Sequence, residues 1–224
     1  MAGTHDAALV ALSVLIATVA SYTALDLAGR MRACSGLSCH AWLATAALAM
    51  GGGIWSMHFV AMLAFSMNDM PVDYDLGLTV LSLALPILVT GIGFYVVSRK
   101  EAGTTALILS GLFMGLGIAA MHYTGMAAMH MAADLTHEHL WVAISLLIAV
   151  GAATVALWLA FRTGQTGFLV QAGAAVAMGL GVSGMHYAAM QGAVFTAHPA
   201  MDHAQGTASL DKPIWRLRSP SRPF

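Results

Sequence analysis

Histidine and methionine occur together at three places in the chain, separated by a fixed interval. Each place carries the pattern M-G-x-G-[IV]-x-x-M-H-[YF]-x-x-M, and the three segments align without gaps. Their histidines are His58, His122 and His186, so the same interval separates the first from the second and the second from the third. A fixed period of this kind is typical of an internal structural repeat.

The residue types in this pattern favour binding of a soft metal ion. Residues four apart share one face of a helix, which places each histidine beside the methionine that ends its copy. Imidazole suits copper and thioether sulfur selects Cu(I), whereas zinc more often uses thiolate or carboxylate. We therefore expect copper, as Cu(I) or Cu(II), to bind the three histidines and their flanking methionines: His58, His122, His186, Met57, Met62, Met121, Met126, Met185 and Met190.

Other residues of the motif are expected to surround these ligands in a second shell. They are Tyr123, Tyr187, Met50, Met114 and Met178. Further histidines and methionines could form a shallow surface that captures metal: His5, His130, His137, His139, His198, His203, Met129, Met131 and Met201. Whether the three histidines form one shared site or three separate sites stays open, although a threefold arrangement at equal depth favours one.

Ordinary packing is the alternative interpretation of the same residues. Methionine commonly fills gaps in cores, and a buried histidine can hydrogen-bond a carbonyl group of a neighbouring helix. Three copies at one depth and in one orientation favour metal binding, although duplication alone would also repeat a packing residue.

The composition predicts that a lipid bilayer surrounds the elements that carry the motif. Hydrophobic residues make up 59% of the chain and charged residues only 8%, whereas soluble domains contain about a quarter charged residues. The net charge of −1 argues against a nucleic-acid partner, which requires a basic face.

Six apolar stretches are long enough to cross a hydrocarbon layer of about 30 Å. A segment in lipid must satisfy its own backbone, so we expect helices and no competing strands. The expected spans are 7–28, 40–65, 75–97, 104–132, 139–161 and 167–195. The predicted fold class is an all-α membrane protein, with six transmembrane helices arranged as three parallel repeats of a two-helix unit in a pseudo-threefold bundle. The membrane domain would cover 1–195, with repeats at about 7–65, 75–132 and 139–195, followed by a polar tail at 196–224.

The basic residues predict the orientation of these helices. Arg and Lys occur in the first, third and fifth loops and are missing from the second and fourth, which favours a multi-pass protein with its N-terminus and C-terminal tail outside. The histidines would then lie about 7 Å outward of the membrane centre, taking 1.5 Å per residue along each helix. An ionisable group at that depth usually marks function.

Glycines and polar residues of the loops lead to further expectations. The paired glycines of each motif would let the three motif helices pack closely against one another. Cys34 and Cys39 lie in a loop assigned to the cytoplasm, where thiols stay reduced. Asp26 should face water or Arg30, and the acidic residues Asp69, Asp73 and Asp75 should form a solvated loop.

The segment Met121-His122-Tyr123-Thr124 resembles the signature of the MHYT domain family, and the resemblance covers about residues 1–195. It implies a bacterial sensory domain in the cytoplasmic (inner) membrane that binds copper through the motif and senses O2, CO or NO. The first copy has Phe59 and Val60 in place of Tyr and Thr, and the third has Ala188 in place of Thr. Better-known members carry a signalling output domain after the membrane part. The segment 196–224 is too short for one, so we expect a separate signalling or copper-protein partner.

Three functions follow from these residues. The first is a membrane sensor or binding module that holds copper and responds to a diatomic gas or to redox state. The second is copper uptake, storage or delivery, and the third is a haem-based sensor in which two histidines ligate iron. We expect no enzyme activity, because no carboxylate, Ser or Cys nucleophile or nucleotide-binding loop accompanies the motif.

Overall fold

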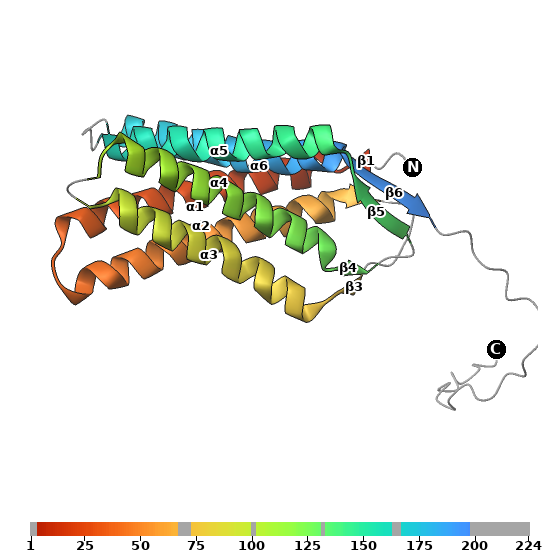
Figure 1. Ribbon diagram of the computed structural model, residues 1–224, viewed down its shortest axis with the longest axis horizontal. Coiled ribbons are helices and arrows are strands. Elements are labelled where there is room, and N and C mark those ends of the chain that lie inside the picture. Colours follow the sequence, from red (N-terminus) through yellow and green to blue (C-terminus); the bar gives the residue numbers. More distant parts are fainter. Residues whose placement is uncertain (1–3, 67–72, 100–101, 131–132, 163–166, 198–224) are drawn as a thin grey trace, which may run out of the picture.

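The chain folds into a bundle of six long helices in a computed structural model that describes residues 4–66, 73–99, 102–130, 133–162 and 167–197 (Figure 1). The helices are α1 (Ala7–Ala33), α2 (Leu37–Ala64), α3 (Leu76–Val97), α4 (Thr104–Ala127), α5 (His139–Arg162) and α6 (Phe168–Gln191). All six are long and apolar enough to cross a membrane. The predicted all-α membrane fold is therefore confirmed, although α4 and α6 end at Ala127 and Gln191, before the ends of the expected spans 104–132 and 167–195.

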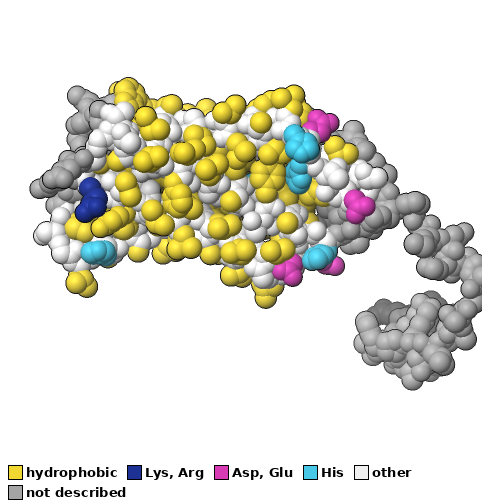
Figure 2. Space-filling model, in the orientation of Figure 1, with side chains coloured by type: hydrophobic (Ala, Val, Ile, Leu, Met, Phe, Trp, Pro, Cys, Tyr) yellow, Lys and Arg dark blue, Asp and Glu magenta, His cyan; other side chains and the backbone are white. Residues whose placement is uncertain are grey.

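The helices form a closed ring in chain order, because each contacts the next and α6 returns to α1. The motif helices α2, α4 and α6 also contact one another, which places them at the centre, with α1, α3 and α5 around them. Hydrophobic side chains cover the middle of the bundle surface in Figure 2, and acidic side chains gather at one end. This distribution fits a protein whose middle part is surrounded by lipid.

The motif glycines pack against the outer helices, so the expectation that they join the motif helices to one another is wrong. Gly51 lies against the backbone of Ile87 in α3, and Gly115 lies against the backbone of Val150 in α5. Gly179 lies against Thr18 of α1 in the same way. Each inner helix sits between two outer helices. Its glycines therefore allow close packing against those outer helices, and they do not face the other inner helices on the axis.

Three short antiparallel strand pairs close one end of the bundle, which we call the strand end. They are β1 (Thr4–His5) with β2 (Phe65–Ser66), β3 (Asp73–Tyr74) with β4 (Met129–His130), and β5 (Ala133–His137) with β6 (Ala193–Ala197). The sequence predicts none of these strands, which lie where the helices begin or end, while all six expected spans form helices. Each pair joins the start of an outer helix to the end of its partner inner helix. The helices bring these segments together, and four of the six described strands have only two residues, which is too short to show an alternating pattern.

The same threefold order appears in the backbone hydrogen bonds beside the strands. The N–H groups of Asp6, Asp75 and Glu138 donate to the carbonyl groups of Ala64, Ala128 and Gly192 at 2.9, 2.8 and 2.9 Å. The Asp75 carboxylate also accepts from the Leu78 N–H at 2.7 Å and so caps α3. Asp75 is therefore a structural cap and not only a solvated loop residue. Asp73 is exposed in β3, and Asp69 lies outside the described residues.

The opposite end, which we call the basic end, carries Arg30 and Arg99. The Arg30 Nε donates to the Asp26 carboxylate at 2.8 Å, as expected. Cys34 and Cys39 form a disulfide, so the expectation of reduced thiols is wrong for this structure. Gly36 turns the chain between them with a positive φ of 71°, and the two Cα atoms lie 5.5 Å apart, within the usual disulfide range.

Candidate metal centre

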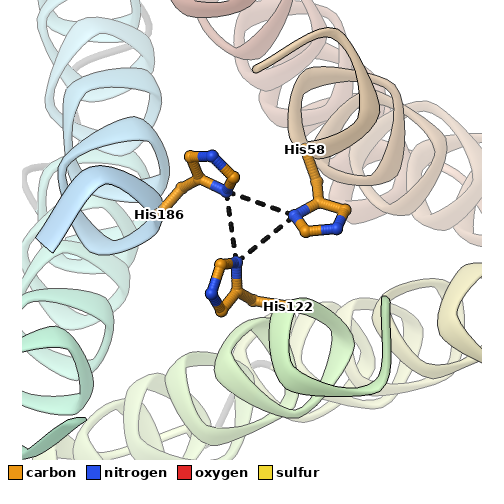
Figure 3. Close-up of side chains that lie close together, drawn as sticks. All are labelled: His58, His122 and His186. Atoms are coloured by element: carbon orange, nitrogen blue, oxygen red, sulfur yellow. Dashed lines mark hydrogen bonds between the residues drawn. The ribbon is translucent and has the colours of Figure 1, made fainter. Parts of the chain in front are cut away.

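Three imidazole rings meet on the axis of the bundle, one from each inner helix (Figure 3). His58, His122 and His186 are at most 1% exposed. Their Nδ1 atoms face one another, at 3.2 Å between His58 and His186, 3.3 Å between His122 and His58, and 3.1 Å between His122 and His186. The equal spacing of the three copies thus brings three equivalent nitrogen atoms to one point.

The size of this nitrogen triangle is close to that of a metal site. The centre of an equilateral triangle lies one side divided by √3 from each corner, which here is about 1.8–1.9 Å. Protein imidazole binds zinc at about 2.0–2.1 Å, a typical length for such a bond. Movement of each ring outward by only a few tenths of an ångström would therefore make room for an ion at the centre.

Hydrogen bonds among the rings do not satisfy the triad by themselves. A neutral imidazole has one N–H group and one lone pair on its two nitrogens. The Nε2 atoms of all three rings are buried without a hydrogen-bond partner among the described residues. Each facing Nδ1 atom carries either the proton or the lone pair, so at least two of the three are alike and cannot hydrogen-bond each other. Burying unsatisfied polar atoms costs about 1–3 kcal/mol each. Three nitrogen donors converging at one point fit a metal ion.

The absence of a side chain at Gly125 leaves space for the His58 ring. A Cβ atom added at Gly125 would lie 2.5 Å from His58 Nε2, which is closer than real contacts allow. The first and third copies have Ala61 and Ala189 at the position of Gly125. The glycine of α4 therefore helps to set the position of the ring contributed by α2.

Methionines lie on one side of the triad and branched aliphatic residues on the other. Met62, Met126 and Met190 follow the histidines by four residues and cluster together with Phe195 toward the strand end. Ile54, Ile118 and Val182 precede the histidines by four residues and are buried in the main core. Met57, Met121 and Met185, each directly before a histidine, are fully buried but rotated about 100° from its face.

The remaining predicted methionines lie apart from the triad. Met50, Met114 and Met178 precede the histidines by eight residues, about 12 Å along a helix. The Met50 sulfur accepts a hydrogen bond from Ser21 of α1, and the Met114 sulfur lies against Gly93 of α3. These contacts belong to the packing between inner and outer helices.

The motif tyrosines contact the triad through their rings only. Tyr123 and Tyr187 pack edge-to-face on His122 and His186, with ring centres 5.0 and 5.1 Å apart. Their hydroxyl groups point to outer helices and share 2.9 Å hydrogen bonds with serines, Tyr123 with Ser145 of α5 and Tyr187 with Ser13 of α1. In the first copy, where Phe59 has no hydroxyl, Trp55 donates to Ser82 of α3 at 3.1 Å.

A second ring of side chains, at the strand end itself, packs against these aromatic residues. His5 packs near Tyr187, Tyr74 near Phe59, and His137 near Tyr123, with ring centres 5.9, 5.4 and 5.1 Å apart. Burial lowers the pKa of His137 and raises the pKa of Tyr74.

Sequence reasoning missed Tyr74 as the equivalent of the two histidines in this ring. The signal was present, because all three residues directly precede the acidic residue that begins an outer helix. Of the other predicted capture residues, His130 and His139 are exposed at the strand end. Met129 is partly buried there. Met131, His198, Met201 and His203 lie outside the described residues.

A family model described as the bacterial signalling protein N terminal repeat, MHYT, matches residues 51–110 and 115–173. The two matches together cover more than half of the chain, and their starts are separated by the same interval as the motif histidines. The chain belongs to the MHYT family. It is therefore a membrane signalling protein of this family, and the predicted resemblance is confirmed. The matched residues include His58 and His122, while His186 belongs to the third copy, whose ring the structure brings to the same site.

Several curated relatives share this MHYT region. The bifunctional diguanylate cyclase/cyclic di-GMP phosphodiesterase MucR of Pseudomonas aeruginosa is 49% identical over 85% of this chain and 28% of its own length. The signaling protein YkoW of Bacillus subtilis is 34% identical over 86% of this chain and 24% of its own. The cyclic di-GMP phosphodiesterase NbdA of P. aeruginosa is 43% identical over 69% and 19%. The MHYT chain thus spans about a quarter of the length of these relatives. No solved structure matches it.

Proposed function

We propose that this MHYT chain is a sensory module that binds one copper ion through His58, His122 and His186. The observation that supports this most strongly is the convergence of three buried Nδ1 atoms, 3.1–3.3 Å apart, on one point. The site lies in the membrane part of a signalling family, where an ionisable cluster usually marks function.

Copper is the metal that best fits this set of donors. Imidazole suits copper among several transition metals, and the thioethers beside the triad would favour Cu(I) among the ions that reach it, without being ligands of the triad ion. Among the described residues, no carboxylate or thiol joins the three histidines in a possible metal cluster, as a zinc site would often require. Copper held by three imidazoles would supply a one-electron couple and an open position for a small ligand such as O2, CO or NO.

The protein can respond at this site because each ligand comes from a different inner helix. A change in the spacing of the three Nδ1 atoms moves α2, α4 and α6 relative to one another. The hydrogen bonds from Tyr123 and Tyr187 to Ser145 and Ser13 pass that movement to α5 and α1. The bundle would then shift between two packings, which is how helical membrane sensors can convert binding into a signal.

The names of two relatives indicate an output for this signal. MucR and NbdA are named as cyclic di-GMP enzymes, so we propose that the bundle controls cyclic di-GMP turnover through a signalling domain or a separate partner. Following the positive-inside rule, we propose that the basic end faces the cytoplasm, next to such an output, and that the strand end faces outside, in a bacterial inner membrane.

The structure gives less support to the two alternatives. Copper transport needs a continued path of ligands, but Ile54, Ile118 and Val182 lie directly inward of the triad and offer none. A haem held by two imidazoles must pass its porphyrin plane between their nitrogens. The Nδ1 atoms are within hydrogen-bond range of each other and leave no such gap.

Elemental analysis of the purified chain tests the proposal. The parent chain in mild detergent, loaded with Cu(I) without oxygen, should hold one copper ion more than each of the variants His58→Ala, His122→Ala and His186→Ala, which lack the triad. Met114→Leu is the matched control, because it removes a buried motif side chain about 12 Å from the triad. Equal copper in parent and histidine variants would overturn the proposal.

A further inference from the structure

The methionines that follow the three histidines form a layer of their own. Met62, Met126 and Met190 come from three different helices, recur at the same interval as the histidines and cluster with Phe195. They are 7%, 1% and 7% exposed. We call these three residues the thioether layer.

The thioether layer lies on the axis directly outward of the triad. Each methionine is four residues after its histidine, which is about 6 Å nearer the strand end on the same helix face. Because the histidines meet on the axis, side chains one turn further along the same face also meet there. The clustering of Met62, Met126 and Met190 agrees with this geometry.

The equivalent layer on the other side of the triad contains no sulfur. Ile54, Ile118 and Val182 hold the positions four residues before the histidines, and they are 1–2% exposed. If the axis required only bulk, branched aliphatic side chains would serve at both levels. Of these two layers, only the one on the strand side carries sulfur, and it does so in all three copies, so the two layers differ in chemistry and not only in size.

Residues between the strand end and the thioether layer outline a route by which an ion could enter. Met129, at the surface strand β4, is partly buried and packs against the layer. Phe65 and Phe195 cover it from the same side, with stacked rings 5.6 Å apart. An ion that follows this route must exchange water for sulfur ligands before it reaches the nitrogen triangle, which favours soft, weakly hydrated cations.

We propose that Met62, Met126 and Met190 form a second, separate site for soft monovalent cations, which loads the triad with Cu(I) from the strand end. This inference rests on the proposed function, since the triad is the destination of the ion. The ion keeps its charge on the way, so the transfer needs neither oxidant nor reductant. The aliphatic layer beyond the triad ends the path, which makes the route an entrance and not a channel.

Silver provides the sharpest test, because Ag(I) prefers sulfur ligands and does not change oxidation state. The parent chain in detergent should bind two Ag(I) ions by titration calorimetry and elemental analysis. The triple variant Met62→Leu/Met126→Leu/Met190→Leu should bind one and load Cu(I) into the triad at least tenfold more slowly. The control Met50→Leu/Met114→Leu/Met178→Leu removes the same number of buried methionines away from the axis and should behave as the parent. Met-to-Leu exchange nearly conserves volume, so both variants should fold.

The outcomes separate the two proposals. A layer variant that binds two Ag(I) ions and loads Cu(I) like the control would overturn the second site and leave the triad unaffected. A His122→Ala chain that still binds one Ag(I) supports the layer even if the triad proves not to bind copper. X-ray absorption of the parent with two equivalents of Ag(I) needs no variant, and a sample without sulfur neighbours around silver would also overturn the inference.

Discussion

The inner helices differ in character between their two halves. Toward the basic end, α2, α4 and α6 present glycines that receive the backbones of outer helices, such as Gly115 against Val150. Toward the strand end, the same helices present histidine and methionine to the axis. Both halves recur at one fixed interval in the three copies, so duplication copied a packing half and a chemical half together. Changes in one half should therefore affect stability, and changes in the other should affect metal binding.

A substitution in the packing half should have the largest effect of all the changes considered, and the effect should be on the stability of the bundle. A Cβ atom at Gly115 would lie 2.5–2.6 Å from the backbone of Val150, which cannot move aside as a side chain could. Gly115→Val should lower the stability of the bundle by about 3 kcal/mol, the upper range for overpacking. Thermal unfolding in detergent, followed by circular dichroism, measures it.

Gly52 provides the matched control for that substitution. A Cβ atom at Gly52 meets nothing within 4 Å, and replacing a helical glycine by alanine gains about 0.5–1 kcal/mol. Gly52→Ala should therefore unfold at or above the temperature of the parent. If both variants were equally stable, the close approach of the outer helices would not support the bundle.

The chemical half should show its clearest effect at a glycine as well. Gly125→Ala places a methyl group 2.5 Å from His58 Nε2 and must displace that ring from the nitrogen triangle. Copper affinity should fall by about tenfold, the lower range for residues that orient metal ligands, while helix content stays unchanged. Competition with a Cu(I) chelator measures it. Gly184→Ala, where the added atom has an ordinary 3.6 Å contact, should bind copper like the parent.

The tyrosine links join the chemical half to the outer helices and should have a smaller effect. Tyr187→Phe removes the hydrogen bond to Ser13 and should cost about 1 kcal/mol of unfolding free energy. A double-mutant cycle with Ser13→Ala isolates the interaction energy of the two hydroxyl groups. If the losses of unfolding free energy in the two single variants add up to the loss in the double variant, the hydroxyl pair contributes nothing. Phe59 already shows that the motif accommodates the change.

The smallest effect should be a pH dependence at the strand end. Burial lowers the pKa of His137 from its ordinary value of 6.5, so the unfolded chain binds a proton there at a higher pH than the folded chain. The contribution of His137 to stability is therefore complete above pH 6.5 and is lost as the pH falls from 6.5 toward its folded pKa. His137→Phe should lose less stability than the parent between about pH 7 and pH 5. If the unfolding free energies of the parent and His137→Phe changed with pH in the same way, this assignment would be contradicted.

Much of this comparison could be predicted from the sequence. The six spans followed from runs of apolar residues, and the recurrence of His58, His122 and His186 at one interval indicated that they share one depth. The rings could meet because a parallel repeat places equivalent residues around one axis.

Other features depend on partners that lie far apart in the sequence. The sequence around Gly51 does not show whether this glycine packs against Ile87 of an outer helix or against another inner helix, because both arrangements require a small residue. Strands of two residues, such as Asp73–Tyr74, form only because two helix ends already lie together. The direction of the Tyr123 hydroxyl depends on Ser145, which belongs to the next repeat unit.

X-ray absorption at the copper edge, on the parent chain loaded with one equivalent of Cu(I), tests the central claim most directly. The nitrogen triangle predicts three nitrogen neighbours at about 2.0 Å, the usual length of a metal–imidazole bond. Multiple scattering from the imidazole rings should identify these neighbours as histidine. A spectrum with sulfur neighbours alone, or a chain that retains no copper, would contradict the assignment of His58, His122 and His186 as its ligands.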